Sequence, residues 1–530
     1  MKNFILALIL VSPLFVFAQD NKSQSIELPD FVITGVQTVN LPIAKKEKAS
    51  FVPILSKDFF LPQYSPEELP LAQVENPIDK KIDLWKNLNS YNGNLYFGLG
   101  GYTLPIGKFF LGQNFNNYFF SLDVFGSNTK DYLPYSSYNV SGATIKNEFY
   151  INTTSAFLPG LRIYLNGNFL RDSYNFYASN NPAVERRTNN GNIELGINNS
   201  LSRFINYNAK VSASQLLINE NGFREIKFNS LASFIFKFPY ISFGATFDYL
   251  QQNVKNGYNN NADYYFYKIE PKLKINTLEN LIINTGLNYS SSNNNNFFSP
   301  FGSIELTLNK NFLMTASFLP HVEFNTHREF IASNIYYNIS KLDNLFTKYK
   351  IDLNTALKYQ YYKYFEIGFS AAFEKIDNYF YFEDNIEQGK FNINKIDDVT
   401  MFGLKLDLLF HPGPYGKFYG EAAYQTVENN SKQIIPYKPY FNTSLNYSYS
   451  FAFGLDVAAN YKMSYKYYTN IQNTDEILFY HNISLTAAYN IFENLQLKAT
   501  LENLLNRKNY LWKNYQDKPF DVIIAVEYKW

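Results

Sequence analysis

The residues best suited to metal chemistry are two histidine–glutamate pairs, His321-Val322-Glu323 and His327-Arg328-Glu329. Imidazole and carboxylate groups that share a loop can bind a divalent cation. The spacing matches no established ligand pattern, and loop histidines beside acidic residues are usually solvated. His321, Glu323, His327 and Glu329 are therefore weak candidates, and we expect no metal and no cofactor.

No serine, aspartate or histidine lies in a recognisable nucleophile motif, and no glycine-rich phosphate loop follows a strand and precedes a helix. We expect no catalytic residues and no enzyme. An active site assembled from distant strands is the remaining enzymatic alternative. Two aromatic groups could stack on a sugar or another flat ligand, or could equally lie at a membrane interface. They are Tyr174, Phe176 and Tyr177, and Tyr379, Tyr381 and Phe382.

The amino terminus has the pattern of a secretory signal peptide over residues 1–18. Lys2 precedes an apolar core, and small Ala18 stands before Gln19, where we expect cleavage. The chain has no cysteine, which excludes a lipoprotein signal, disulfides and thiolate metal sites. After the signal no uncharged apolar run of about 18 residues occurs, so the sequence does not predict a membrane-spanning helix.

The composition favours a membrane β-barrel. The chain is 46% hydrophobic and 18% aromatic, yet alternation of lipid-facing and polar residues would keep its mean hydropathy at −0.27. Its 45 tyrosines and 50 phenylalanines exceed the needs of an ordinary core but suit interfacial girdles and a lipid face. The net charge of +1 argues against a nucleic-acid partner.

The last residues, 521–530, show the alternation most clearly. Val522, Ile524, Val526, Tyr528 and Trp530 share one parity and Glu527 and Lys529 the other, so one face suits lipid and the other water. An edge strand of a soluble sheet is the alternative. Residues 443–463 repeat the pattern in two strands, with a tight reversal near Phe451. Because a charge on the lipid face costs about 2 to 4 kcal/mol, the charged parity must face the lumen.

Tight turns alternate with long polar connections from Gly93 onward, as an antiparallel barrel requires. The expected tight turns are 114–117, 158–160, 238–240, 277–280, 411–416 and 492–494. The expected outward loops are 129–143, 174–189, 256–262, 292–298, 320–347, 377–397, 428–437, 467–477 and 505–519. This pattern predicts an all-β transmembrane antiparallel barrel of about 22 strands, within about 20 to 24, over residues 93–530. Residues 19–92 hold 7 of the 21 prolines and one glycine, which predicts an extended periplasmic segment.

This strand number and several local runs resemble the TonB-dependent outer-membrane receptors. The closing hairpin of that family resembles Leu501–Asn506, Tyr510, Tyr515, Pro519 and the Trp530 strand, although the usual Gly-Arg is missing here. Residues 435–439 and 93–108 resemble a late strand entry and the opening hairpin. The resemblance implies the bacterial outer membrane, with outer-membrane lipid around the barrel. It also implies that the barrel-assembly machinery reads Val526, Tyr528 and Trp530.

Near the amino terminus, Leu28-Pro29-Asp30-Phe31-Val32-Ile33-Thr34-Gly35 resembles a TonB box. The resemblance implies that Asp30, Phe31, Val32, Ile33, Thr34 and Gly35 pair with TonB. A short β-prone run on an exposed tether could add to another protein's sheet edge, which suits that role. An acidic residue before a β-branched run and glycine is also common by chance.

The family carries a globular plug between box and barrel, and 74 proline-rich residues look too short and extended to be one. A barrel of this size needs a filled lumen. A separate plug or surface-binding protein could fill it, the loops and amino-terminal segment could fill it, or the pore is open. We expect a receptor barrel that takes part in uptake across the outer membrane. The alternative is a passive porin or structural scaffold without energy coupling.

Overall fold

A computed structural model describes residues 92–530, apart from 156–157, 200, 203, 257–259, 279, 293–294, 340–344, 363, 385–388 and 412–414. The expected signal peptide, its Ala18–Gln19 cleavage site and the TonB-box run Asp30–Gly35 lie outside these residues. No helix within the described ranges has the length and apolar character needed to cross a membrane.

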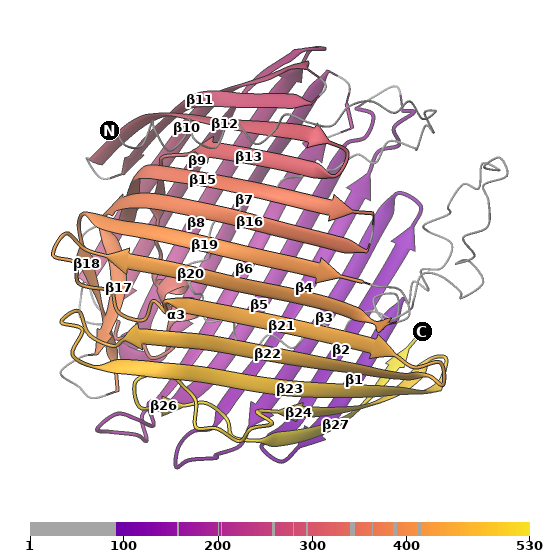
Figure 1. Cartoon of the computed structure of the whole chain (residues 1–530), viewed down its shortest axis with the longest axis vertical. Coiled ribbons are helices and arrows are strands. Elements are labelled where there is room, and N and C mark those ends of the chain that lie inside the picture. Colours follow the sequence, from indigo (N-terminus) through magenta and orange to yellow (C-terminus); the bar gives the residue numbers. More distant parts are fainter. Residues whose placement is uncertain are drawn as a thin grey trace, which may run out of the picture. The chain divides into compact units, whose positions relative to one another are not determined.

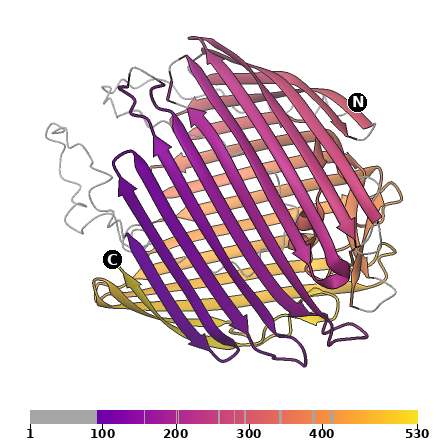
Figure 2. The same cartoon turned by 180° about the vertical axis from the view of Figure 1, so that it is seen from behind.

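The described residues form a closed antiparallel barrel (Figures 1 and 2). The main sheet has 23 strands, but β13 and β14 both pair with β15 and form one interrupted wall strand, so the described wall has 22. The first half of the wall is β1 (Gly93–Gly100), β2 (Thr103–Phe115), β3 (Tyr118–Thr129), β4 (Tyr138–Tyr150), β5 (Arg162–Asn175), β6 (Glu185–Asn199), β7 (Ile205–Ile218), β8 (Phe223–Lys237), β9 (Ile241–Asn256), β10 (Asn260–Leu278) and β11 (Leu281–Ser292). The second half is β12 (Asn295–Asn309), β13 (Phe312–Phe318) with β14 (His321–Phe324), β15 (Phe346–Tyr361), β16 (Phe365–Asp377), β19 (Val399–Phe410), β20 (Lys417–Glu428), β21 (Phe441–Ser450), β22 (Leu455–Tyr468), β23 (Glu476–Phe492), β24 (Leu495–Glu502) and β27 (Asp521–Lys529).

The terminal strand closes the wall. β27 pairs with β24 on one side and with β1 on the other, with Asn94 opposite Lys529 and Gly100 opposite Ile523. Gly93 and Trp530 exchange two backbone hydrogen bonds of 2.9 and 3.1 Å. A Cβ on Gly93 would meet the Trp530 ring at 2.1 Å, so glycine allows this close approach. The prediction of a closing strand is confirmed, and an edge strand is excluded.

The two faces of β27 differ as predicted. Val522, Ile524, Val526 and Tyr528 are 38 to 50% exposed, whereas Ile523, Ala525 and Glu527 are 5% exposed or less. The pair β21–β22 repeats this, because Tyr447 is exposed on the outer face while Ser448 and Asp456 are buried. The outer wall therefore presents apolar side chains and the lumen polar ones, as a lipid-embedded barrel requires.

The two rims of the barrel differ. The turn rim carries the first residue of β1, the end of β27 and short reversals such as 116–117, 238–240, 451–454 and 493–494. The opposite loop rim carries the long connections. Three of the predicted loops, 320–347, 377–397 and 505–519, contain regular structure: α3 (His327–Ser333), the hairpin β17 (Tyr379–Asp384) with β18 (Phe391–Ile396), and the hairpin β25 (Tyr510–Trp512) with β26 (Tyr515–Gln516). The short 3-10 helix η2 (Glu220–Gly222) lies between β7 and β8, where no loop was predicted.

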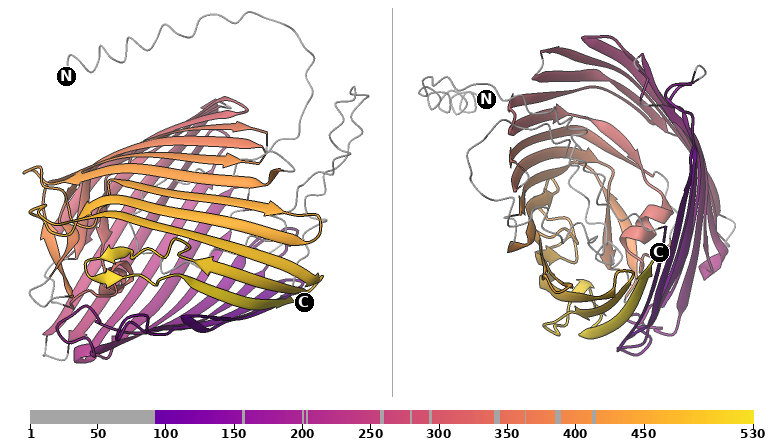
Figure 3. Two further views of the ribbon diagram at one scale, coloured as in Figure 1. Left: turned by 60° about the horizontal axis from the view of Figure 1, so that its bottom comes forward. Right: turned by 90° about the vertical axis from the view of Figure 1, so that its right-hand side faces the viewer.

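Most buried apolar side chains gather near the loop rim rather than along the wall. Three clusters join wall strands to α3, to the β17–β18 hairpin and to the β25–β26 segment. Figure 3 shows the hairpins at that rim and α3 within the outline of the wall. The outward loops thus fold inward over the lumen.

Candidate functional site

We call the inward-folded loops at the loop rim the loop cap. As far as they are described, they comprise residues 130–137, 176–184, 325–339, 379–384, 389–396, 429–440, 469–475 and 503–520. Their shared core is aromatic and consists of Tyr174, Phe176, Ile335, Tyr336, Phe391, Tyr437, Tyr467, Trp512 and Tyr515. Residues from five separate connections and from the strands β5 and β22 therefore meet in one packed layer.

Ring contacts hold this layer together. The rings of Tyr336 and Tyr515 stack with centroids 3.4 Å apart and an interplanar angle of 16°. Tyr177 meets Tyr515 edge-on at 4.9 Å, and Tyr437 meets Trp512 at 4.5 Å. Such aromatic pairs contribute about 0.5 to 1.5 kcal/mol each beyond the burial of their area.

The tyrosine hydroxyls of the cap bind the backbone of other loops. Tyr174 donates to the Ile335 carbonyl at 2.5 Å, Tyr177 to Gln516 at 2.7 Å, Tyr467 to Tyr510 at 2.5 Å and Tyr515 to Gly389 at 2.6 Å. Each bond supplies a donor to a backbone carbonyl of another loop, and the Ile335 and Gln516 carbonyls accept a second bond, from Arg186 and Tyr132. These rings are structural, so Tyr174 and Phe176 are not free to stack on a ligand.

Arg186 on β6 fixes the position of the loop that contains α3 by hydrogen bonds to the backbone of that loop. Its side chain is 0% exposed, and its Nη1 donates to the carbonyls of Ile335 at 3.1 Å and Tyr337 at 2.7 Å. Nε donates to Glu220 at 2.8 Å, and the guanidinium lies 4.5 Å from the centroid of the Phe176 ring. A buried guanidinium needs such a complete set of partners because its desolvation is costly.

The start of α3 is stabilised by a capping box and by a hydrogen bond to strand β8. Thr326 and Glu329 form a capping box, with bonds of 2.9 and 3.3 Å. The His327 backbone N–H donates to Glu225 of β8 at 2.9 Å, and its Nδ1 lies 3.0 Å from the Tyr337 hydroxyl. Burial lowers the pKa of His327 to about 4, so this imidazole is neutral at physiological pH.

A salt bridge ties two further loops of the cap. Lys513 lies 2.9 Å from Asp475, which joins 503–520 to 469–475. Their hydrogen bond raises the pKa of Lys513 and lowers that of Asp475. Both groups are partly exposed, so the pair adds little stability but fixes the relative position of the loops.

A cavity of about 1180 Å³ extends along the wall from the loop cap to the turn rim, where Glu493 and Asn494 line it. Its polar side is formed by inward side chains of β19–β24, β27 and β1–β4, and its aromatic ceiling by cap residues such as Tyr177, Tyr336 and Trp512. Ligand sites typically measure about 300 to 1,000 Å³, so this space would hold a molecule of several rings.

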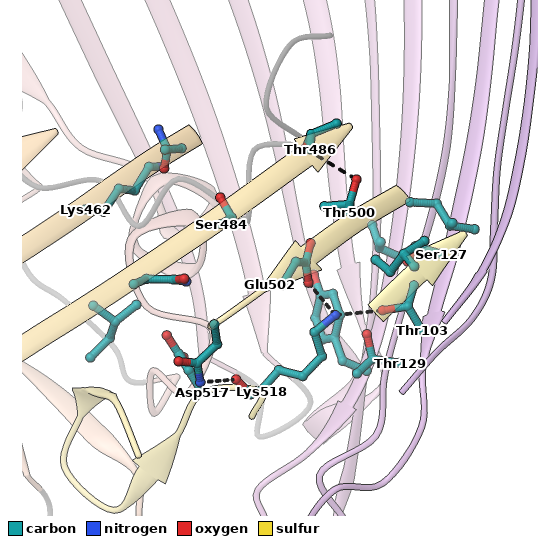
Figure 4. Close-up of a pocket in the computed structure, with 18 of the residues that line it drawn as sticks. Thr103, Ser127, Thr129, Lys462, Ser484, Thr486, Thr500, Glu502, Asp517 and Lys518 are labelled. Atoms are coloured by element: carbon teal, nitrogen blue, oxygen red, sulfur yellow. Dashed lines mark hydrogen bonds and ion pairs between the residues drawn. The ribbon is translucent and has the colours of Figure 1, made fainter. Parts of the chain in front are cut away.

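Charged side chains on the cavity wall form pairs (Figure 4). Lys518 of the cap binds Glu502 at 2.5 Å and Asp521 at 2.8 Å, and donates to the Thr103 hydroxyl at 2.7 Å. Lys498 forms an ion pair with Glu527, both almost fully buried. Lys405 lies 3.0 Å from Glu421.

The two candidate metal pairs lie in different settings. His321 stacks on Tyr349 at 4.4 Å and lies 3.7 Å from Glu323 and 3.5 Å from Asp352. His327 and Glu329 serve the start of α3 instead. Within the described ranges, no three His, Cys, Asp or Glu residues gather in a way that could hold a metal ion.

The remaining sequence candidates have clear positions. Val526 and Tyr528 face outward, and Trp530 stacks on Tyr528 at 5.8 Å beside Gly93. Arg186 was missed by sequence reasoning, since its carbonyl partners lie 149 and 151 residues away and nothing local marks it. The start of α3 did carry a signal, because Thr326 followed by Glu329 is a capping-box spacing.

No protein-family model and no curated protein matches the sequence. Solved structures do match. The FrpB iron transporter from Neisseria meningitidis aligns with a TM-score of 0.64 at 11% identity, over 84% of this chain and 83% of that chain. The siderophore receptor PiuA from Acinetobacter baumannii gives 0.62 at 12% identity, over 83% and 81%. The ferric-catecholate import receptor Fiu from E. coli K12 gives 0.62 at 10% identity, over 83% and 82%.

At this identity the likeness concerns the fold. The chain has the 22-strand barrel architecture of these receptors and transporters. The predicted resemblance of the fold to the barrel of TonB-dependent receptors is confirmed, and the location in a bacterial outer membrane stays a prediction.

Proposed function

We propose that this protein is a receptor barrel of the TonB-dependent type that takes part in uptake across the bacterial outer membrane. One observation carries the proposal most strongly. A closed 22-strand wall of receptor size has its loop rim covered by its own loops, above a cavity in the lumen. A covered cavity suits a barrel that binds a ligand and releases it on demand.

The loop cap also weighs against the alternative of a passive porin. A porin needs a continuous aqueous path through its lumen, whereas here five connections pack around a buried aromatic core. A structural scaffold would need no cavity of about 1180 Å³ beneath that core. Receptor function accounts for both features.

The energy for release would come through Asp30–Gly35, which we propose as the contact with TonB. We further propose that a separate plug or surface-binding protein acts with this barrel. The turn rim, where β1 begins at Gly93, faces the periplasm in this arrangement. Surrounding lipid and the barrel-assembly machinery, which would read Val526, Tyr528 and Trp530, are the other expected partners.

Deletion of Asp30–Gly35 tests the coupling. The expected result is loss of uptake and of site-specific crosslinking to TonB, with normal barrel assembly. Deletion of the equally short Lys45–Ser50 run, downstream in the same segment, is the matched control. Unchanged uptake and no crosslink in the wild type would overturn the coupled function.

A further inference from the structure

The neutral polar groups of the cavity differ from its charged ones, because several lack hydrogen-bond partners. Asn482 Oδ1 on β23 and Gln496 Oε1 on β24 are buried acceptors that receive no hydrogen bond from the residues described. Trp512 Nε1 in the ceiling is an unpaired donor on a side chain only 7% exposed. An unpaired buried polar group destabilises the protein, so a ligand that reached these atoms and supplied partners would gain their hydrogen bonds.

The hydroxyl groups beside these atoms are neutral too. Ser484, Thr486 and Thr500 face the same space, and the last two hydroxyls lie 3.4 Å apart (Figure 4). The neighbouring Lys498 and Lys518 are engaged by carboxylates. This part of the wall therefore offers amide and hydroxyl groups, while most of its charge is internally balanced.

We infer that the cavity binds a neutral, polyhydroxylated molecule, specifically an oligosaccharide. Gln496 lies opposite Asn490, eight residues along β23 from Asn482, which separates the two amides by roughly 26 Å at about 3.3 Å per residue. Only an extended chain of sugar rings, whose hydroxyls both donate and accept, can therefore reach both amide acceptors and the indole donor. The C–H faces of sugar rings can pack against the aromatic ceiling, where Tyr177 and Tyr336 lie. This inference rests on the proposed function and names the class of its cargo.

An anionic ligand is less well matched. Lys462 does bring an ammonium group to this wall, directly across from Asn482 on the adjoining strand. Glu502 and Asp517 line the same cavity, so an anion would meet like charge as well. Of the lysines that line the cavity, Lys462 is the one opposite Asn482 and is therefore the one to substitute in a test of the anionic ligand class.

Calorimetric titration of the purified full chain tests the inference with defined probes. Maltoheptaose and cellohexaose represent neutral oligosaccharides, oligogalacturonate an anionic one, and a ferric catecholate the cargo type of a structural neighbour. We expect binding of at least one neutral oligosaccharide. A second readout is the emission of Trp512, isolated by Trp85→Phe and Trp530→Phe, which should shift on binding.

Variants locate the site. Asn482→Ala and Gln496→Ala should each weaken binding about tenfold, the loss of one hydrogen bond of about 1.4 kcal/mol. Asn190→Ala on β6 is the control, since its Oδ1 is also unpaired but does not line the cavity. Tighter binding of oligogalacturonate that is lost in Lys462→Gln, or binding of neither neutral probe, would overturn the inference.

The two proposals fail in distinguishable ways. Binding requires only the barrel and its cap, so deletion of Asp30–Gly35 must leave oligosaccharide affinity unchanged. Absent oligosaccharide binding with intact TonB crosslinking refutes the ligand class alone. Intact binding with no crosslink and no energy-dependent uptake refutes the coupled function alone.

Discussion

Arg186 offers the sharpest perturbation of the loop cap. Arg186→Ala removes the donor for the Tyr337 carbonyl, one of the two donors for the Ile335 carbonyl, and a partner of Glu220. A hydrogen bond to a charged group contributes about 1.5 to 3 kcal/mol. Loss of the two bonds to the loop therefore destabilises its inward position by about 3 kcal/mol or more, which corresponds to roughly a 150-fold rise in the open population.

The chain has no cysteine, so a single introduced thiol can report this opening. Ser484→Cys places a thiol in the cavity, and a bulky membrane-impermeant maleimide is added to intact cells. In the wild-type background labelling should be slow, because the loop cap covers the site. With Arg186→Ala the labelling rate should rise about two orders of magnitude, up to the limit set by reagent diffusion.

Two controls separate cap opening from general damage. Gln472→Cys lies on an exposed part of the loop cap and should react at the same fast rate in both backgrounds. Arg187→Ala removes a neighbouring arginine whose side chain is half exposed and pairs only peripherally with Glu185, so Ser484→Cys should stay slow. Equal labelling rates of Ser484→Cys with and without Arg186 would refute the claim that Arg186 stabilises the inward position of the loop.

Three further predictions concern the wall, the lipid face and pH. Glu527→Ala leaves Lys498 buried without its counter-charge and should lower the free energy of unfolding by about 3 to 5 kcal/mol. The measurement is the temperature at which the compact, folded band disappears in gels, which should fall. The double variant Lys498→Met with Glu527→Met should recover most of the lost stability. Ile524→Arg places a charge in lipid and should lower the free energy of unfolding from vesicles by about 2 to 4 kcal/mol; an unchanged value would contradict the assigned face. Burial lowers the pKa of His327 to about 4, against 6.5 when the imidazole is exposed. The loop cap is therefore fully stable above pH 6.5 and loses up to about 3 kcal/mol of stability as the pH falls toward 4. Bilayer conductance should therefore rise on acidification, and His327→Gln should flatten that response.

The strands of the wall could be predicted because the alternation of apolar and polar residues within each strand assigns its two faces. Ile524 and Glu527 need only their parity in sequence to be assigned to opposite faces. The role of residues 521–530 as the closing strand agreed with the even strand count, since an even count returns both ends of the barrel to one rim.

The loop cap could not be predicted in the same way. The stack of Tyr336 on Tyr515 and the bonds of Arg186 join residues far apart in sequence, and loop conformation depends on such packing rather than on local periodicity. Asn482 and Gln496 could be assigned to the lumen by parity. Which lumenal groups lack partners becomes visible only when neighbouring strands are in register.

Single-channel recording of the wild-type protein in planar bilayers at neutral pH tests the central claim most directly. A receptor barrel covered by its own loops should show no steady conductance, and Arg186→Ala should open a large one. A large, steady conductance in the wild type would contradict the account and identify an open pore.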